Sequence, residues 1–108
     1  MIKVSVMYPH AEGARFDHAY YRDRHMPMVK ARLGSACNYY TVEKGLAGST
    51  PGSPPTFVAT CAFICDSAEA YQAVMREHGS EIRGDIVNYT DIVPVIQFSE
   101  VVVERSEP

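Results

Sequence analysis

The order in which two hydrophobic periods alternate constrains the fold of this chain most. Apolar side chains recur at every second residue in some segments, which is typical of strands, and every three to four residues in others, which is typical of helices. Strands are predicted over residues 2–8, 37–43, 57–65 and 92–104, helices over 17–33 and 66–78, and a helical turn over 81–87. The order is strand–helix–strand, twice. It predicts one α+β domain over residues 1–108, ferredoxin-like (βαββαβ), with a four-stranded antiparallel sheet and both helices on one face.

The predicted sheet has one face that no helix covers, and this face indicates a homodimer. Residues 57–65, FVATCAFIC, are apolar on both alternating faces, and either face could be the uncovered one. Exposing such a face to water costs about 25 cal/mol per Å² of apolar surface. A homodimer whose two sheets enclose apolar space would cover it. The Gly- and Pro-rich loop at residues 44–56 is predicted to be a lid or a segment that contacts a partner.

The first predicted helix has recognisable ends. Asp17 is a good N-cap, because its carboxylate can accept from free backbone N–H groups of the first turn. Phe16 and Tyr21 flank this cap as a hydrophobic staple. Gly34 can end the helix in a left-handed conformation.

Pro27 disturbs the same helix. It lacks the N–H that the carbonyl of Asp23 would accept, so the helix must kink or restart beside His25. Spacings of four, seven and eleven residues predict one stripe, formed by Tyr21, His25, Met28 and Arg32. This stripe is either core, with His25 a satisfied buried imidazole, or the site of a general base with a tyrosine partner. Periodicity alone favours the core.

Other polar residues are weaker candidates for a site. His78 ends an apolar helical stripe before Gly79, and is either a C-terminal histidine beside the helix dipole or a second pocket histidine. Gln97 lies in the last predicted strand, at a pocket or a dimer interface. Asp85, Asn88, Tyr89 and Asp91 serve turns and caps or line the pocket mouth, and turns are favoured. The four histidines match no metal-binding motif.

Composition excludes several partners. The net charge of −3 and the absence of a basic stripe argue against nucleic acid. No run approaches the roughly 18 apolar residues of a membrane span, and the first residues do not resemble a signal peptide. The three cysteines are an odd number and indicate small buried hydrophobes rather than a disulfide framework. A cytoplasmic protein is expected.

Several motifs together resemble the EthD family, named for ethyl tert-butyl ether degradation. They are Phe16-Asp17, Tyr20-Tyr21, His25-Met26-Pro27, Gly34, residues 77–82 (EHGSEI) and residues 86–101 (IVNYTDIVPVIQFSEV). The resemblance covers nearly the whole chain. It implies a dimeric α/β barrel with a cavity in each subunit between sheet and helices, and no obligate cofactor. It also implies that His25 is the family's histidine and that Tyr20 and Tyr21 are its tyrosine pair.

With this resemblance, His25 is expected to be a catalytic acid/base, with Tyr21 orienting the imidazole or the substrate. Tyr39 or Tyr40, whichever faces inward, could bond a substrate oxygen, and Tyr20 is a further substrate-binding candidate. The expected function is cofactor-independent isomerisation, dehydration or monooxygenation of a small hydrophobic oxygenated molecule. The alternatives are a ligand-binding or accessory protein for a partner oxygenase, and a dimeric scaffold with a vestigial cavity.

Overall fold

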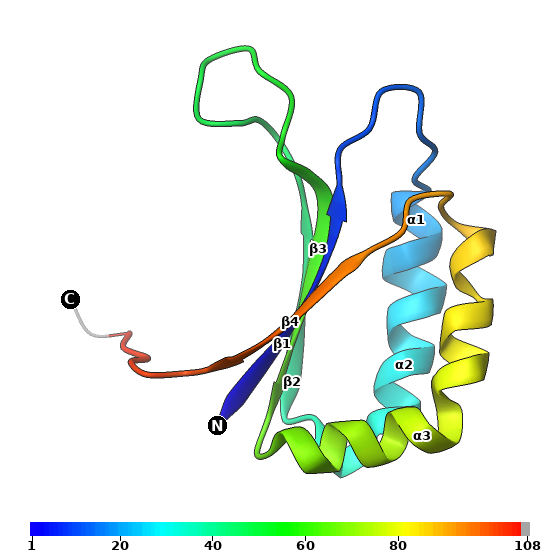
Figure 1. Ribbon diagram of the computed structural model, residues 1–108, viewed down its shortest axis with the longest axis vertical. Coiled ribbons are helices and arrows are strands. Elements are labelled where there is room, and N and C mark those ends of the chain that lie inside the picture. The colour runs from blue at the N-terminus through cyan, green and yellow to red at the C-terminus, as the bar shows by residue number, and fades with distance from the viewer. Residues whose placement is uncertain (107–108) are drawn as a thin grey trace.

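The computed structural model describes residues 1–106 and contains one four-stranded antiparallel sheet (Figure 1). Its strands are β1 (Ile2–Pro9), β2 (Tyr39–Lys44), β3 (Phe57–Cys65) and β4 (Val95–Glu100), in the order β2-β3-β1-β4. The helices are α1 (His18–Tyr20), α2 (Met26–Leu33) and α3 (Ala68–Gly84), and all lie on one side of the sheet. The predicted ferredoxin-like α+β fold is confirmed.

The register of the sheet settles which face packs against the helices. Val4 is fully buried and pairs with Phe63 of β3 and Phe98 of β4. Side chains alternate along a strand, so the helix-facing set of β3 is Ala59, Cys61, Phe63 and Cys65. The opposite face carries Ser5, Ala62 and Gln97 at neighbouring positions, and no helix covers it.

A π-helical segment, Tyr21–His25, joins α1 to α2. The N–H of Met26 bonds to the carbonyl of Tyr21, five residues back, and Pro27 follows in the first turn of α2. The predicted disturbance beside His25 is therefore confirmed. Because Pro27 cannot donate to the carbonyl of Asp23, the helix takes up one extra residue and restarts.

The extra residue changes which side chains face the core. Tyr21 and His25 are buried as predicted, but the buried positions that follow are Met26, Val29 and Leu33. The predicted continuation of the stripe through Met28 and Arg32 is wrong: Met28 is half-buried and Arg32 is exposed. A regular 3.6-residue period cannot anticipate a π-helical turn.

The predicted ends of the first helix are mostly confirmed. The Asp17 carboxylate accepts from the N–H of Tyr20 at 3.1 Å, and the rings of Phe16 and Tyr21 lie 5.1 Å apart. Gly34 ends α2 with φ 53° and ψ −128°. Its φ is positive as expected, but its ψ is not that of the left-handed helix.

The prediction that Gly79 breaks the second helix is wrong. α3 continues through it to Gly84 and is followed by a 3₁₀ turn, Ile86–Asn88. Instead of ending, α3 changes direction along its length: it crosses one end of the molecule and then runs beside α1 and α2 (Figure 1).

The last strand is shorter than predicted. Pro94 immediately precedes β4, as expected from its missing N–H, but residues 92–94 and 101–106 are outside any strand. β4 pairs only with β1, whose first residue Ile2 lies opposite Glu100, so the ladder runs out there. β2 also begins two residues later than predicted, at Tyr39.

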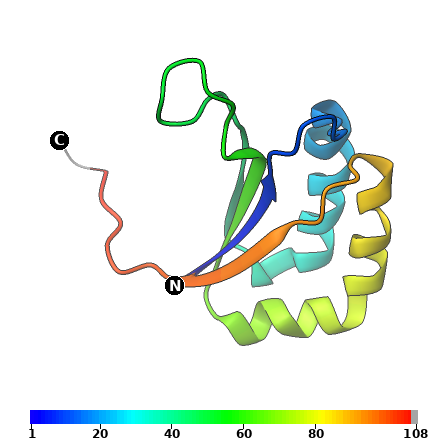
Figure 2. The same cartoon turned by 45° about the horizontal axis from the view of Figure 1, so that its top comes forward.

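The loop at residues 45–56 and the segment at 101–106 project away from the helices (Figures 1 and 2). Both extend on the side of the sheet that carries no helix. Within residues 1–106, no helix combines the length and apolar character needed to cross a membrane.

Candidate functional site

A cavity of about 570 Å³ lies between the sheet and the helices. Its sheet wall is formed by helix-facing side chains of β1, β3 and β4, namely Val6, Tyr8, Cys61, Phe63, Ile96 and Phe98. The other wall comes from the π-helical segment, α2 and α3. The size and the mostly apolar lining suit a small hydrophobic molecule.

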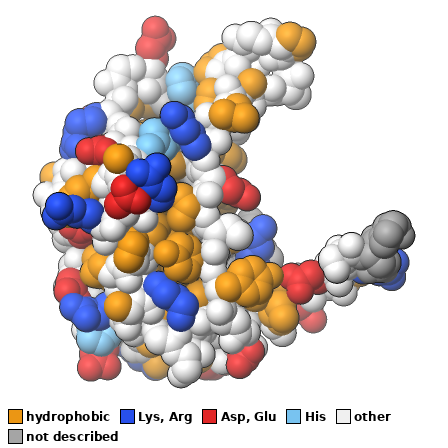
Figure 3. All heavy atoms as spheres, turned by 180° about the vertical axis from the view of Figure 1, so that it is seen from behind, with side chains coloured by type: hydrophobic (Ala, Val, Ile, Leu, Met, Phe, Trp, Pro, Cys, Tyr) orange, Lys and Arg blue, Asp and Glu red, His pale blue; other side chains and the backbone are white. Residues whose placement is uncertain are grey.

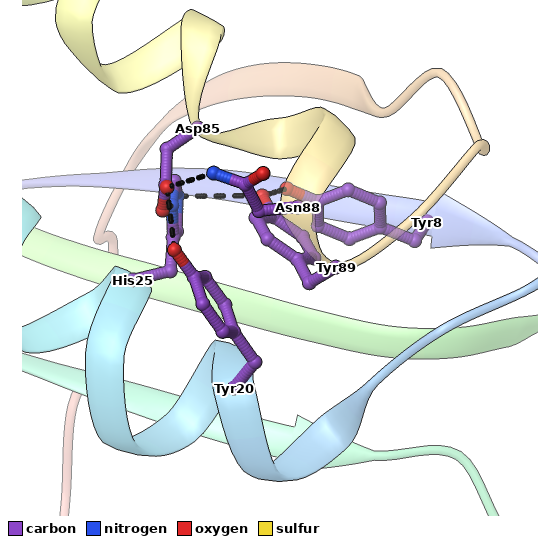
Figure 4. A network of polar contacts seen from close by, with 6 residues as sticks. All are labelled: Tyr8, Tyr20, His25, Asp85, Asn88 and Tyr89. Carbon is purple, nitrogen blue, oxygen red and sulfur yellow. Dashed lines mark hydrogen bonds and ion pairs between the residues drawn. The ribbon is translucent and has the colours of Figure 1, made fainter.

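His25 lies on the wall of this cavity and is 4% exposed. Its Nδ1 is 2.9 Å from Oδ2 of Asp85, and its Nε2 is 3.3 Å from the hydroxyl of Tyr89 (Figure 4). Asp85 is the residue that follows α3, so this pair joins the end of α3 to the π-helical segment that carries His25. His25 is thus held on both ring nitrogens at a cavity wall.

The protonation of the pair follows from its surroundings. Burial alone would raise the pKa of Asp85, but hydrogen bonds from Asn88, Tyr20 and His25 outweigh it and leave the pKa below the usual range. For His25, burial lowers the pKa, and the Asp85 carboxylate only partly opposes this. At neutral pH the pair is therefore a neutral imidazole beside an ionised carboxylate.

This charge state fixes the direction of the hydrogen bonds. An ionised carboxylate only accepts, so Nδ1 of His25 carries the proton and Nε2 has the lone pair. The Tyr89 hydroxyl then donates to Nε2. The Tyr8 hydroxyl, 2.6 Å away, donates to that of Tyr89. Burial raises the pKa of Tyr8 to about 12, which keeps it a donor at cellular pH.

The segment that carries Asp85 and Tyr89 is tied to the start of the first helix. The N–H of Asp17 donates to the carbonyl of Tyr89 at 2.8 Å. The Thr90 hydroxyl donates to the carbonyl of Arg15 at 2.6 Å, and the Arg15 guanidinium donates to the carbonyl of Val87 at 2.7 Å. These bonds fix the position of residues 87–90 relative to the start of the first helix.

Tyr21 lines the cavity and stacks on His25, with ring centroids 5.6 Å apart and planes 15° apart. Its hydroxyl is buried and has no hydrogen-bond partner among the described residues. An unpaired buried hydroxyl costs free energy, and burial raises the pKa of Tyr21, which keeps this hydroxyl protonated. The hydroxyl that bonds the imidazole belongs to Tyr89.

The other predicted site residues lie away from the cavity walls. Tyr39 is exposed and donates to Glu104 at 2.9 Å, while Tyr40 is half-buried and packs 6.3 Å from the ring of Phe63. His78 is half-buried within α3, and Gln97 is exposed on the uncovered sheet face.

Tyr20 joins the network from outside, since its hydroxyl donates to Oδ1 of Asp85 at 2.7 Å.

Sequence reasoning missed three members of the network. The sequence favours Asp85 and Tyr89 as turn residues and predicts for Tyr8 only a place in the strand over residues 2–8. Asp85 does serve a turn, since its Oδ1 accepts from Asn88 at 2.9 Å. No sequence signal distinguishes this role from its bond to His25.

The three cysteines, Cys37, Cys61 and Cys65, are free and buried. Burial raises the pKa of Cys61, on the cavity wall, to about 12, so it is a thiol at neutral pH and a poor nucleophile. Within residues 1–106, no group of three or more His, Cys, Asp or Glu side chains could hold a metal ion.

The fold places the chain in the ferredoxin-like α+β class, and the comparisons with known proteins then define its family. The model of the EthD domain matches residues 10–92. The chain therefore belongs to the EthD family.

Solved structures support this placement. An EthD-like protein from Ralstonia eutropha JMP134 is 79% identical, with a TM-score of 0.95 over 97% of this chain and 95% of that one. An ethyl tert-butyl ether degradation (EthD) family protein from Bacillus halodurans C-125 is 20% identical, with a TM-score of 0.68 over 93% and 97%. A dimeric ferredoxin-like protein from an uncultured marine organism is 12% identical, with a TM-score of 0.63 over 99% and 100%. At 20% and 12% identity, the last two structures show similarity of fold alone. The comparison with curated proteins gives no match.

Proposed function

We propose that the protein binds a small hydrophobic oxygenated molecule in the cavity and that His25 acts there as a general acid/base without a cofactor. The observation that carries this proposal is the hydrogen bond between Nδ1 of His25 and Asp85 at the cavity wall. Asp85 holds the proton on Nδ1 at 2.9 Å, which leaves the Nε2 lone pair available. The bond from Tyr89 to Nε2 is long, at 3.3 Å, and a substrate group can replace it.

The proposed step is proton abstraction from a carbon next to a carbonyl. The C–H bond breaks, its proton moves to Nε2 of His25, and the electron pair becomes an enolate. Tyr21 lines the cavity beside His25, and in this step we expect its hydroxyl to turn toward the cavity and donate to the developing oxyanion. Return of the proton to another carbon or loss of a leaving group would complete an isomerisation or a dehydration.

The carbon acid 2-tetralone tests this step, because it is hydrophobic, oxygenated and small enough for the cavity. In D₂O, NMR should show exchange of its α-protons faster than in buffer. His25→Gln should lower the enzymatic rate by about 10²-fold or more, the range for loss of a general base. His78→Gln, which removes a histidine outside the cavity walls, should leave the rate unchanged. Exchange that is equal in the two variants would overturn the role of His25.

The same experiment addresses the alternative of a ligand-binding or accessory protein. The apolar cavity favours that alternative as much as it favours catalysis, because binding needs no base. Saturation-transfer NMR that shows bound 2-tetralone without accelerated exchange would support binding over catalysis. Absence of binding at millimolar 2-tetralone would contradict both functions for ligands of this class.

A homodimer in the cytoplasm is part of the proposal. The sheet face without helices is flanked by the projecting loop at residues 45–56 and the segment at 101–106, and the outline is hollowed between them (Figure 3). A second sheet placed there would cover Val95, which is 50% exposed, and complete the dimeric barrel that we expect. Three buried free thiols suit a reducing compartment.

A further inference from the structure

Two arginines stand out on the otherwise mostly apolar cavity wall. Arg76 and Arg83 both line the cavity, both come from α3, and both are exposed to solvent. With Gln72, they occur at spacings of four and seven residues, which places polar groups along one side of this helix. The lining includes no Asp or Glu. The cavity wall therefore carries positive charge in a chain whose net charge is −3.

Neither guanidinium is neutralised within the described part of the chain. Arg22 and Arg32 show the contrast, because each has a carboxylate partner at 2.7 Å. No carboxylate lies within 4.0 Å of the charged nitrogens of Arg76 or Arg83 among residues 1–106. Lys or Arg side chains lie among hydrophobic ones on the face shown in Figure 3.

The Arg83 guanidinium lies against Gly79, where no side chain occupies the space. A Cβ at Gly79 would lie 2.7 Å from Nη1 and 3.0 Å from Nη2 of Arg83, so any larger residue would displace this group. A glycine inside a helix costs roughly 0.5–1 kcal/mol relative to alanine. Here it lets the planar guanidinium lie against the helix one turn before its own Cα.

We propose that the ligand of the cavity is an amphipathic carboxylic acid. Its hydrophobic body fills the apolar space, and its carboxylate pairs with Arg83, with Arg76 adding to the positive field. A carboxylate fits because the planar fork of one guanidinium matches its two oxygens. This inference rests on the proposed function and narrows the class of small oxygenated molecule.

Two probes of the same shape test it, naphthalene-2-carboxylate and naphthalene-2-carboxamide. Calorimetry on the full chain should show the carboxylate bound about two- to fivefold more tightly than the amide, the range for an exposed ion pair. Arg83→Gln should remove most of this preference and leave amide affinity unchanged. Arg76→Gln should reduce the preference less. Raising the salt from about 0.01 M to 0.5 M should also reduce it, because exposed charges are screened.

Arg22→Gln is the matched control, since it removes the same charge from an exposed position outside the cavity. It should keep the full preference for the carboxylate. Gly79→Ala is a second test that retains both arginines. It should lower the carboxylate preference by displacing the Arg83 guanidinium, while thermal denaturation shows a folded protein.

The outcomes separate this inference from the proposed function. Equal affinity for the two probes, or a preference that Arg83→Gln leaves intact, would overturn the carboxylate assignment while the cavity remains a binding site. Failure of both probes to bind at millimolar concentration would overturn the proposed function and this inference with it.

Discussion

At His25, two opposing effects act on one imidazole. Burial lowers its pKa and the Asp85 carboxylate raises it in part, with a pKa below the usual 6.5 as the result. The folded state thus takes up this proton less readily than the unfolded chain does. The contribution of His25 to stability is fully present above about pH 6.5 and is lost as the pH falls through the folded-state pKa. Asp85 affects stability at a more acidic pH. Because its pKa is lowered in the folded state, the ionised carboxylate stabilises the protein above the usual carboxyl pKa, and this stabilisation is lost as the pH falls through the folded-state pKa of Asp85.

Asp85→Asn should lower the pKa of His25 further, because it removes the nearby negative charge and leaves the burial. NMR titration of the imidazole nitrogens would measure this shift and would also show the proton on Nδ1 in the unaltered protein. Asp23→Asn is the control: it removes a carboxylate that lies two residues from His25 but bonds Arg22. A His25 pKa at or above 6.5, or an equal shift in the two variants, would contradict this account of the site.

At the scale of elements, the helix from Asp17 to Gly34 shows how a local rule shapes the site. Pro27 removes one backbone donor, and the turn before it widens into a π-helical segment that ends at His25. Tyr21 and His25 remain stacked across that turn, while the following core residues move by one position. Turns of this kind are often found at functional sites.

Gly34 ends this helix, and its backbone conformation predicts the effect of a substitution there. Its φ of 53° with ψ −128° is a conformation that residues with a Cβ rarely adopt, although no atom would obstruct a Cβ there. Gly34→Ala should destabilise the protein by about 1–3 kcal/mol through backbone strain alone. Gly84→Ala is the matched control, because its space is equally open and its φ is not positive. It should stabilise by roughly 0.4–1 kcal/mol. Urea denaturation would measure both, and shifts of the same sign would refute the argument.

At the scale of the whole molecule, the sheet has two unlike faces. One packs on the helices and encloses the cavity. The other carries Ser5, Ala62 and Gln97 near its middle and is open within the single chain. The projecting loop and the segment at 101–106 flank this open face (Figure 2). These features favour pairing of two copies through their sheets.

Sedimentation should therefore give about twice the chain mass of 12.0 kDa at micromolar concentration. Ser5→Arg should shift the equilibrium to monomers, because it places like charges in the centre of the paired faces. Ser80→Arg makes the same change on the exposed surface of α3 and should leave the dimer intact. A mass near 12.0 kDa for the unaltered protein, or dissociation by both variants, would contradict the proposed interface.

The sequence by itself determined the features that depend on near neighbours. Alternation and helical period predicted the order of strands and helices, because each pattern is read within a few residues. The cap at Asp17 and the disturbance at Pro27 were predicted for the same reason, since both concern backbone donors within four residues. The family resemblance pointed to His25 among four histidines.

Only the tertiary structure decided which polar groups meet. Asp85, Tyr89 and Tyr8 form one network with His25, yet the bonded pairs are separated by 60, 64 and 81 residues. No local period encodes contacts of that range, because they depend on how α3 returns beside the first helix. The same return sets Arg83 on the cavity wall. Folding therefore makes a site from residues that the sequence alone assigned to turns, a strand and a helical turn.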